Sequence, residues 1–447
     1  MRQDLFYIPH EIFGLPVFGA GWLLILWALA SAILLVWLWR RQGWSAETRS
    51  YLPVIIIVGA VIWQVLPRIE ASAPVRPPID RGAQENGSVA SPGEQSPNNQ
   101  PIGLPIRGYG VMLLLAVVSG VAVAVWEGRR GGLDPEAVYS FSFYLFIGGI
   151  VGARLFYIIE YWPQFQRPTL MATLGAMLNV TQGGLVVYGS LIGASAMGLW
   201  YLRKQRLPIL AMADLIAPSM MLGLALGRIG CLLNGCCHGG VCDKGDFGIT
   251  FPKGSPPYIQ QSELGELHGF RIGTTDDGDS AIVDRVEPDG PAAGSGLSVG
   301  ARIRSINGVT IDSYNAALSI LATTPAELFI ETDTGTAHIR LSEVPARSRP
   351  VHPTQIYSSI NAGLLFLLLW SYYPSRRRDG EVFALLLSLY PIARILLEII
   401  RTDEPGQLGT SLTISQIVSL GLLVIGFALW GVILRRPHGT VFPVATS

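Results

Sequence analysis

The chain has 447 residues, of which 50% are hydrophobic and 14% are charged, and its mean hydropathy is +0.41. Because soluble proteins average roughly 25% charged residues, this composition indicates a membrane protein. Lysine plus arginine and aspartate plus glutamate number 32 each, so the net charge of zero gives no reason to expect nucleic acid or another polyanion as a partner.

Nine apolar stretches approach or exceed the roughly 20 residues that a helix needs to cross a bilayer. In chain order they are residues 17–38, 51–66, 108–126, 139–161, 183–202, 208–232, 356–373, 381–400 and 411–434. No cleavable signal peptide is expected, because Arg2 is the one basic residue before the first stretch and no small-residue cleavage site follows it. The sequence therefore predicts a polytopic α-helical membrane protein.

Five clusters of basic residues test these spans against the positive-inside rule. They follow the first, third, fifth, seventh and ninth spans: Arg40-Arg41, Arg129-Arg130, Arg203-Lys204-Arg206, Arg376-Arg377-Arg378 and Arg435-Arg436. With nine spans, this alternation puts every cluster on the cytoplasmic side. The N-terminus and the 240–350 region are then expected outside the cell, and the C-terminus in the cytoplasm.

The first two spans, within residues 1–67, are predicted to be an added hairpin. Residues 14–26 (GLPVFGAGWLLIL) resemble residues 103–115 (GLPIRGYGVMLLL), which indicates a duplicated entry into a span. Chance similarity between two apolar segments is the alternative. Residues 68–105 between them are rich in Pro, Ser, Gly, Asn and Gln and are predicted to be a disordered linker.

Residues 244–347 are polar, with alternating strand-like runs and turn glycines, and are predicted to form a small α/β extracytoplasmic domain. The run from Ser280 to Ile311 resembles a PDZ domain. The matching features are a strand over 281–286, a turn over 288–293, and a strand and turn over 300–308.

A PDZ domain binds a peptide by adding it as a strand to a sheet edge. The resemblance therefore implies an extracytoplasmic peptide or protein partner, with Gly269 and Phe270 in the peptide groove. Residues 267–270 depart from the usual Gly-Leu-Gly-Phe, which puts capture of a C-terminal carboxylate in doubt. A purely structural β-domain is the alternative.

Arg228 lies in an otherwise apolar run, LALGRIGCLLNGCCHGG, at 224–240. An arginine inside an apolar span costs about 2.5–3.5 kcal/mol on insertion scales, so it usually faces a cavity or an anionic ligand. Snorkelling to the membrane surface is the alternative. Further along, Arg394 and Glu398 are four residues apart on one helical face and are expected to pair. Such a pair either belongs to an anion site or only holds helices together.

Several of these segments occur together and in order. They are the G-x-G with Tyr109, GGIVGARL, GGLVVYG, Asp214 ahead of GR-x-G, HPTQIY, YPIARILLE and Ser415-Gln416. In this respect the chain resembles the prolipoprotein diacylglyceryl transferases, bacterial enzymes of lipoprotein maturation, over residues 103–239 and 351–434. The resemblance implies a seven-span core in the plasma (inner) membrane. It also implies transfer of diacylglyceryl from phosphatidylglycerol to the lipobox cysteine of a prolipoprotein, with no cofactor and no metal.

By position, the resemblance implies that Arg228 and Arg394 hold the phospholipid phosphate and are catalytic together with Tyr188 and Glu398. The positions expected to bind substrate are Tyr109, Asp214, Cys231, Asn234, Gly239, His352 and Tyr390.

Three positions depart from the family pattern. Tyr188 stands where the family commonly has a histidine, Cys231 where it has an asparagine, and Cys236 where it has a glutamate. A tyrosine of ordinary pKa, about 10, is a poor base. The phosphate-binding half of the site is thus expected to be retained and the proton-handling half altered, with His238 as a further candidate for a proton acceptor.

All four cysteines fall between residues 231 and 242, with the spacing C-x4-C-C-H-x3-C. Zinc sites favour C-x2-C pairs, so this spacing argues against a metal site. A disulfide, Cys231–Cys236 or Cys237–Cys242, fits an oxidising exterior. Inert small residues or a reactive thiol are the other interpretations.

The expected architecture is a seven-span transferase core preceded by a two-span hairpin and interrupted by the PDZ-like domain. In order, we predict a hairpin, a linker, the first part of the core, the PDZ-like domain, the second part of the core and a tail, at 1–67, 68–105, 106–243, 244–347, 348–436 and 437–447. The alternatives to the transferase are a divergent paralogue that binds phospholipid or modifies another thiol or lipid, and a PDZ-bearing membrane scaffold.

Overall fold

The computed structural model describes residues 4–43, 46–69, 71–74, 99–179, 184–242, 247–275, 280–399 and 412–442. These residues form two compact units. The smaller one comprises the described residues of 4–108 together with Asn179, and the larger one comprises those of 109–178 and 184–442.

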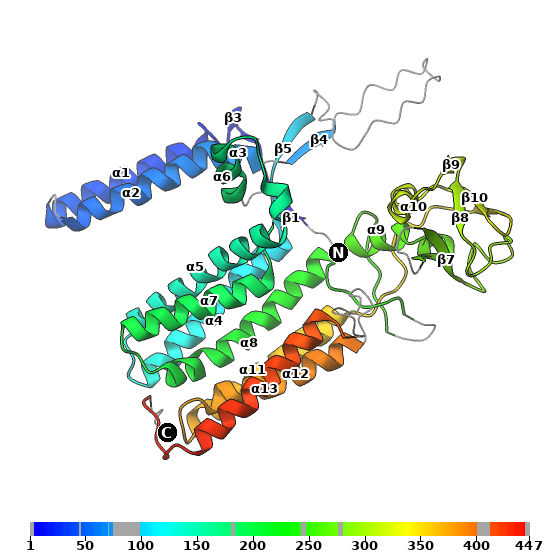
Figure 1. Ribbon diagram of the computed structural model, residues 1–447. Helices are drawn as coiled ribbons and strands as arrows, with labels where there is room; N and C mark the ends of the chain where they lie inside the picture. The colour runs from blue at the N-terminus through cyan, green and yellow to red at the C-terminus, as the bar shows by residue number, and fades with distance from the viewer. Residues whose placement is uncertain are drawn as a thin grey trace. The chain divides into compact units, whose positions relative to one another are not determined.

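The smaller unit combines a helical hairpin with short strands. Its helices are α1 (Trp22–Gln42) and α2 (Ala46–Ala60), with α2 continuing through a π-helical turn, η1 (Val61–Val65), into α3 (Leu66–Ile69). Helices α1 and α2 pack against each other (Figure 1).

Strands occupy both ends of the segment, 68–105, that was predicted to be a disordered linker. Strand β5 (Asn99–Arg107) pairs with β1 (Asp4–Pro9) on one side and β4 (Ala71–Pro74) on the other, and β2 (Glu11–Ile12) pairs with β3 (Leu15–Pro16). The linker prediction was therefore wrong at both of its ends. Residues 75–98 lie outside the described residues.

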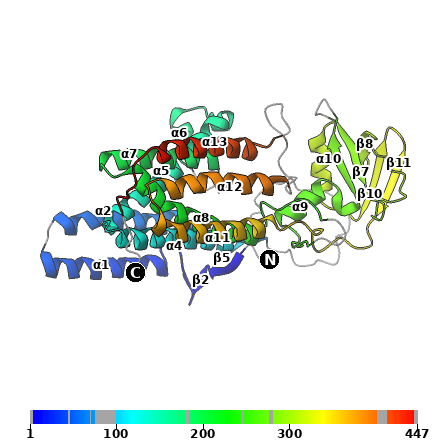
Figure 2. The same ribbon diagram turned by 90° about the horizontal axis from the view of Figure 1, so that it is seen from below.

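A bundle of helices makes up most of the larger unit. The long helices are α4 (Gly108–Arg130), α5 (Pro135–Glu160), α7 (Val187–Lys204), α8 (Ile209–Asn234), α11 (Thr354–Tyr372), α12 (Glu381–Ile399) and α13 (Ile414–Leu434). Short helices η2 (Trp162–Phe165), α6 (Leu170–Leu178) and η4 (Tyr373–Ser375) join them. The long helices run side by side in both ribbon views (Figures 1 and 2).

Each predicted span coincides with a helix in the described part of the chain. By length and hydropathy, five of the described helices qualify as membrane-crossing: Trp22–Arg41, Gly108–Arg130, Pro135–Glu160, Ile209–Asn234 and Ile414–Leu434. Helices α7, α11 and α12 are shorter and less uniformly apolar, and they pack within the same bundle. The structure thus supports a polytopic α-helical membrane protein.

Two glycine pairs allow α5 and α7 to approach closely. Gly148 and Gly152 on α5 face Gly189 and Gly193 on α7, and a Cβ on Gly193 would lie 2.2 Å from the Gly148 carbonyl oxygen. Small residues four apart are the usual means by which membrane helices bring their backbones together. The GGIVGARL and GGLVVYG motifs therefore serve helix packing, whatever else they do.

Replacing one of these glycines should destabilise the bundle. Gly193→Ala is expected to lower stability by about 1–3 kcal/mol, since the obstructing atoms belong to backbone that must shift. The measurement is the thermal midpoint of the detergent-solubilised chain. Gly421→Ala is the matched control, because Gly421 of α13 has open space at its Cβ position. Equal midpoints for the two variants would contradict the close packing of α5 on α7.

The insert between α8 and α11 is a small α/β domain with its own core. Strands β11, β10, β8 and β9 (Thr336–Arg340, Glu327–Thr332, Ile303–Ile306, Val309–Thr310) form one sheet. Strands β6 and β7 (Phe270–Thr274, Ala281–Val286) form a second. Helix α10 (Tyr314–Leu321) lies beside the strands (Figure 2) and buries Ala317 and Leu321 in the core that both sheets share.

The strand predictions for the insert are confirmed at 281–286 and within 300–308. Asn307 and Gly308 have φ of 50° and 75°, as a two-residue hairpin turn between β8 and β9 requires. Helix α9 (Pro256–Glu263) and η3 (Glu266–His268) precede β6.

The predicted peptide groove at Gly269 and Phe270 is not open in the structure. Phe270 is 1% exposed and belongs to the core of the insert. The Gly269 amide donates to the Glu266 carbonyl and the Phe270 amide to the Gly265 carbonyl, so neither is available to a peptide carboxylate. The Ile272 amide donates to Leu264, which covers part of the β6 edge.

Burial of His268 makes the insert sensitive to acid. The ring is fully buried, Nε2 lies 2.8 Å from the Pro325 carbonyl oxygen, and Nδ1 has no hydrogen-bond partner among the described residues. Desolvation lowers the pKa of His268. The hydrogen bond to Pro325 raises this pKa, but by less than desolvation lowers it. The unfolded chain therefore binds a proton below about pH 6.5 that the folded insert resists.

The stability of the insert should fall as the pH drops below about 6.5, by at most about 1.4 kcal/mol per pH unit from this group. Hydrogen exchange in residues 256–341 of the full chain, corrected for intrinsic rates, measures this. His268→Gln keeps a hydrogen-bond donor for the Pro325 carbonyl and cannot titrate. The part of the pH dependence that this variant loses is therefore due to His268. Burial raises the pKa of Glu266, which opposes the trend and is common to both chains. Identical pH profiles would refute this prediction.

Candidate active site

Arg228 lies in the last two turns of α8 and is half-buried. Within the part of the chain that the structure describes, its side chain forms neither a hydrogen bond nor an ion pair. A half-buried guanidinium in an apolar helix without a protein anion is suited to an anionic ligand.

Tyr109 at the start of α4 is a neighbour of this end of α8. A Cβ on Gly230 would lie 3.2 Å from the Tyr109 ring, so the two helices nearly touch there. Tyr109 is close enough to interact electrostatically with Arg228 and with three cysteines, Cys231, Cys236 and Cys237. The structure therefore brings Tyr109, Arg228 and Cys231 together.

The cysteine cluster differs from the sequence-based expectation. The sulfur atoms of Cys231, Cys236 and Cys237 all lie within 4.8 Å of one another, and all four cysteines are unbridged. Neither proposed disulfide is present. Linear spacing argued against a metal site, but Gly235, with φ of 79°, ends α8 and turns the chain so that Cys236 and Cys237 return to Cys231.

The loop after α8 is held by the start of α11. Thr354 donates its hydroxyl to the Cys237 carbonyl at 2.7 Å, and Gln355 donates its amide to the Cys236 carbonyl at 2.8 Å. The Gly239 amide donates to the His352 carbonyl, and a Cβ on Gly239 would lie 2.8 Å from the His352 Cβ. Gly239 and His352 thus join the two halves of the core across the insert. Sequence reasoning missed the roles of Thr354 and Gln355.

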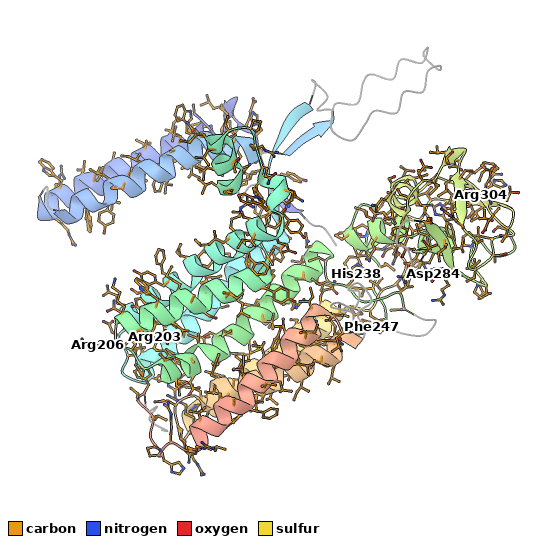
Figure 3. The ribbon with its side chains drawn as sticks, viewed as in Figure 1. Arg203, Arg206, His238, Phe247, Asp284 and Arg304 are labelled. Carbon is orange, nitrogen blue, oxygen red and sulfur yellow. The ribbon has the colours of Figure 1, made fainter. Side chains whose placement is uncertain are left out.

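Two histidines lie in this region. His238 Nδ1 is 2.9 Å from the Gly239 carbonyl oxygen, which assigns the proton to Nδ1 and leaves Nε2 as an acceptor. His352 donates its backbone amide to the Gly240 carbonyl. In Figure 3, His238 and Phe247 lie at the end of the bundle opposite Arg203 and Arg206, where α7 gives way to α8.

Arg394 and Glu398 form the predicted ion pair on α12. Arg394 also donates to the Ser415 hydroxyl at 2.9 Å, and Glu398 accepts from the Thr413 hydroxyl at 3.1 Å. Thr413 caps α13 in a reciprocal arrangement with Gln416. The pair therefore joins α12 to the start of α13, which is the helix-holding alternative, and one face of Arg394 is already engaged.

Arg228 and Arg394 lie at the same depth in the bundle. Asp214 accepts hydrogen bonds from the Gly380 and Phe383 amides, so Asp214 of α8 and the first residues of α12 lie at the same level along the bundle. Fourteen residues separate Asp214 from Arg228 and thirteen separate Glu381 from Arg394, a rise of roughly 20 Å in each helix. Both guanidinium groups thus lie near the far end of their helices.

This geometry contradicts the prediction that Asp214 binds substrate. Its carboxylate is fully buried, accepts the two amides at 2.7 and 2.9 Å, and lies 3.6 Å from the buried Arg376 guanidinium. Roughly 20 Å of helix separates it from Arg228. Asp214 therefore secures the N-terminus of α12 at the basic end of the bundle.

The remaining predicted residues lie on the surrounding helices. Tyr188 is half-buried in the first turn of α7, at the end opposite Arg203. Tyr390 is half-buried one turn before Arg394 and packs against the bundle core. Asn234 is the last residue of α8 and is half-buried.

Arg154, considered with these groups because it lies inside a span, has a structural role. Its guanidinium donates to the carbonyls of Ala176, Met177 and Gly184 at 3.0, 2.8 and 3.1 Å, and so ties down the C-terminal end of α6.

An apolar cavity of about 570 Å³ extends from Tyr109 along the bundle. Residues of α4, α5, α7 and α8 line it, among them Val117, Phe146, Val187 and Met220. Ser142, Ser190 and Ser219 are the lining side chains that carry hydroxyl groups besides Tyr109. The cavity is therefore suited to a hydrocarbon chain. Tyr109 lines this cavity and is also close to the cysteine cluster.

An apolar cavity within a bundle of long apolar helices defines a polytopic α-helical membrane protein. Residues 99–432 match the family described as prolipoprotein diacylglyceryl transferase, and the chain belongs to this family.

Three bacterial relatives resemble the chain over most of its length. A phosphatidylglycerol–prolipoprotein diacylglyceryl transferase of Rhodopirellula baltica is 34% identical, covering 94% of this chain and 87% of its own. The protein of the same name from Clostridium tetani is 26% identical over 74% of this chain and 94% of its own, and that from Geobacillus kaustophilus 28% over 75% and 90%.

Proposed function

We propose that this protein transfers diacylglyceryl from phosphatidylglycerol to the lipobox cysteine thiol of prolipoproteins. The observation that carries the proposal is Arg228, a half-buried arginine that no protein anion pairs with in the described chain and that lies near Tyr109, which lines the apolar cavity. Family membership and the names of the relatives support the same reaction.

The lipid is bound by its two chemically distinct parts. The acyl chains occupy the cavity between α4, α5, α7 and α8, and the phosphate lies beside Arg228, whose guanidinium can donate two parallel hydrogen bonds to it. Arg394, at the same depth, is held in place by Glu398 and Ser415 and supplies a second positive charge.

In the reaction, the acceptor thiolate attacks the glyceryl carbon that carries the phosphate, and glycerol phosphate leaves with the electron pair of the C–O bond. Arg228 and Arg394 stabilise the negative charge that develops on the leaving phosphate. Tyr188 and the Nε2 atom of His238 are the proton acceptors that we propose for the thiol.

The test is a transfer assay with the purified full chain, phosphatidylglycerol and a lipobox peptide, and its readout is the lipidated peptide by mass spectrometry. The expected result is a product that the same peptide with serine in place of cysteine does not give. Failure, together with failure to rescue a bacterium that lacks its own transferase despite normal expression, would favour the lipid-binding paralogue.

We propose that nine spans place the N-terminus and the insert outside the cytoplasm of a bacterial inner membrane and the C-terminus inside. In support, three of the basic clusters gather at one end of the bundle. Arg378 donates to the Arg436 carbonyl at 2.9 Å, and Phe442 contacts Gly131 beside the 129–130 cluster. An impermeant thiol reagent applied to intact cells should label Arg304→Cys in the insert and spare Arg203→Cys.

We propose further that the insert, 244–347, is a PDZ-like domain that binds an extracytoplasmic peptide. The β6–β7 pair with α10 beside it supports this. Because the amides of Gly269 and Phe270 are engaged, the ligand is an internal peptide segment and not a free C-terminus. Deleting 250–345 should abolish capture of such peptides while basal lipid transfer persists. Loss of every function on deletion would favour the scaffold.

A further inference from the structure

The clustered thiols of Cys231, Cys236 and Cys237 have no role in the proposed transfer as described so far. Cys231 lies three residues after Arg228 and thus on the same face of α8. The three sulfur atoms lie within 4.8 Å of one another, and each residue is partly buried. Such a set of soft donors is unusual at an extracytoplasmic helix end, where free thiols oxidise readily.

The backbone holds the cluster in a single arrangement. The Cys236 amide donates to the Cys231 carbonyl at 3.1 Å, and Thr354 and Gln355 bind the carbonyls of Cys237 and Cys236. Cys237 has φ of 58°, a left-handed conformation that non-glycine residues seldom adopt. Backbone strain of this kind is concentrated at functional sites, where surrounding contacts impose it.

We propose that Cys231, Cys236 and Cys237 bind a zinc ion through three thiolates and leave its fourth coordination position open. Zinc–sulfur bonds of about 2.3 Å in a tetrahedron put the sulfur atoms about 3.8 Å apart, so the cluster needs to contract by about 1 Å at most. Zn²⁺ with three thiolates carries one negative charge, which Arg228 on the same helix face offsets. Three protein ligands are the number found at reactive zinc sites, whereas structural sites have four.

The open position binds the acceptor thiol, and this role rests on the proposed transferase function. A thiol that coordinates zinc loses its proton, here to water, and remains a thiolate at neutral pH. The zinc-bound sulfur then forms the S–C bond to the glyceryl carbon as the C–O bond to phosphate breaks, and glycerol phosphate departs with the electron pair. No oxidant or reductant is required. Coordination by zinc thereby deprotonates the acceptor thiol, a step for which Tyr188, which replaces the family's histidine, is a poor base.

Metal binding is tested first on the full chain in detergent, loaded with Zn²⁺ or Co²⁺ under reducing conditions. The expected result is one bound zinc per chain, and with Co²⁺ the thiolate-to-metal charge-transfer absorption. Cys231→Ser, Cys236→Ser and Cys237→Ser should each weaken binding by more than about 10-fold. Cys242→Ser is the matched control, because Cys242 lies outside the cluster and should bind metal as the wild type does.

The acceptor role is tested by adding a lipobox peptide to the Co²⁺-loaded chain. A fourth thiolate should increase the charge-transfer absorption, and the peptide with serine in place of cysteine should not. Removal of zinc should abolish lipid transfer, and its return should restore it.

The outcomes separate the two proposals. Lipid transfer that is indifferent to chelation, in a chain that binds no Co²⁺, overturns the zinc site and leaves the transferase intact. Specific binding to the three cysteines without any transfer upholds the metal site and overturns the transferase. Binding of Cu⁺ alone, or a Cys231–Cys236 disulfide in chains whose free thiols were blocked within intact cells, also overturns the zinc site.

Discussion

Arg228→Ala is expected to lower kcat/KM for lipid transfer by at least about 10²–10³-fold, the range for losing one charge-stabilising donor at a reacting group. Arg228 is half-buried, lies next to the apolar cavity through Tyr109, and has no anion of the described protein to neutralise it. Its loss removes the charge proposed to bind the phosphate. The measurement is the initial rate of peptide lipidation over a range of phosphatidylglycerol concentrations.

Two further variants make the result specific. Arg228→Lys keeps the charge and loses the planar pair of donors, so an intermediate rate is expected. Arg304→Ala, an exposed arginine of the insert, is the control and should leave the rate unchanged. If Arg228→Ala retains normal activity while its thermal midpoint falls, Arg228 is a structural residue and does not bind the phosphate.

Asp214→Ala is expected to destabilise the chain by about 3–5 kcal/mol, the effect of breaking a buried ion pair on one side. The substitution leaves the Gly380 and Phe383 amides without an acceptor and the buried Arg376 guanidinium without its carboxylate. The KM for phosphatidylglycerol should stay unchanged in the fraction that folds, because Asp214 is roughly 20 Å of helix away from Arg228.

Thermal denaturation in detergent and lipid titration of the surviving enzyme measure the two effects separately. Asp312→Ala, which removes an exposed carboxylate of the insert, is the control and should change neither quantity. A raised KM with an unchanged midpoint would instead restore the sequence-based prediction that Asp214 binds substrate.

The helices and their order were predictable from the sequence, because an apolar run of bilayer length has few other stable conformations in lipid. The ion pair of Arg394 and Glu398 was predictable as well, since spacing of four on a helix sets side-chain proximity locally. The same holds for the Asn307-Gly308 turn, where the residue types favour the positive φ that a two-residue hairpin turn requires.

Tertiary structure decided the rest. Asp214 and Arg228 share a helix and a sequence motif, yet only the packing of α12 against α8 assigns one to a helix end and leaves the other for a ligand. The groove predicted at Gly269 and Phe270 is closed by hydrogen bonds and core contacts from η3 and Leu264.

The sequence by itself determined a set of membrane-spanning helices with an arginine inside one of them, because hydropathy and helical periodicity depend on neighbouring residues. It did not determine that three thiols converge beside that arginine. Their convergence depends on the left-handed turn at Gly235 and on hydrogen bonds from Thr354 and Gln355, more than a hundred residues away along the chain. Spacing along the sequence predicts which ligands lie close together on one helix or strand. These thiols are instead brought together by contacts between different elements.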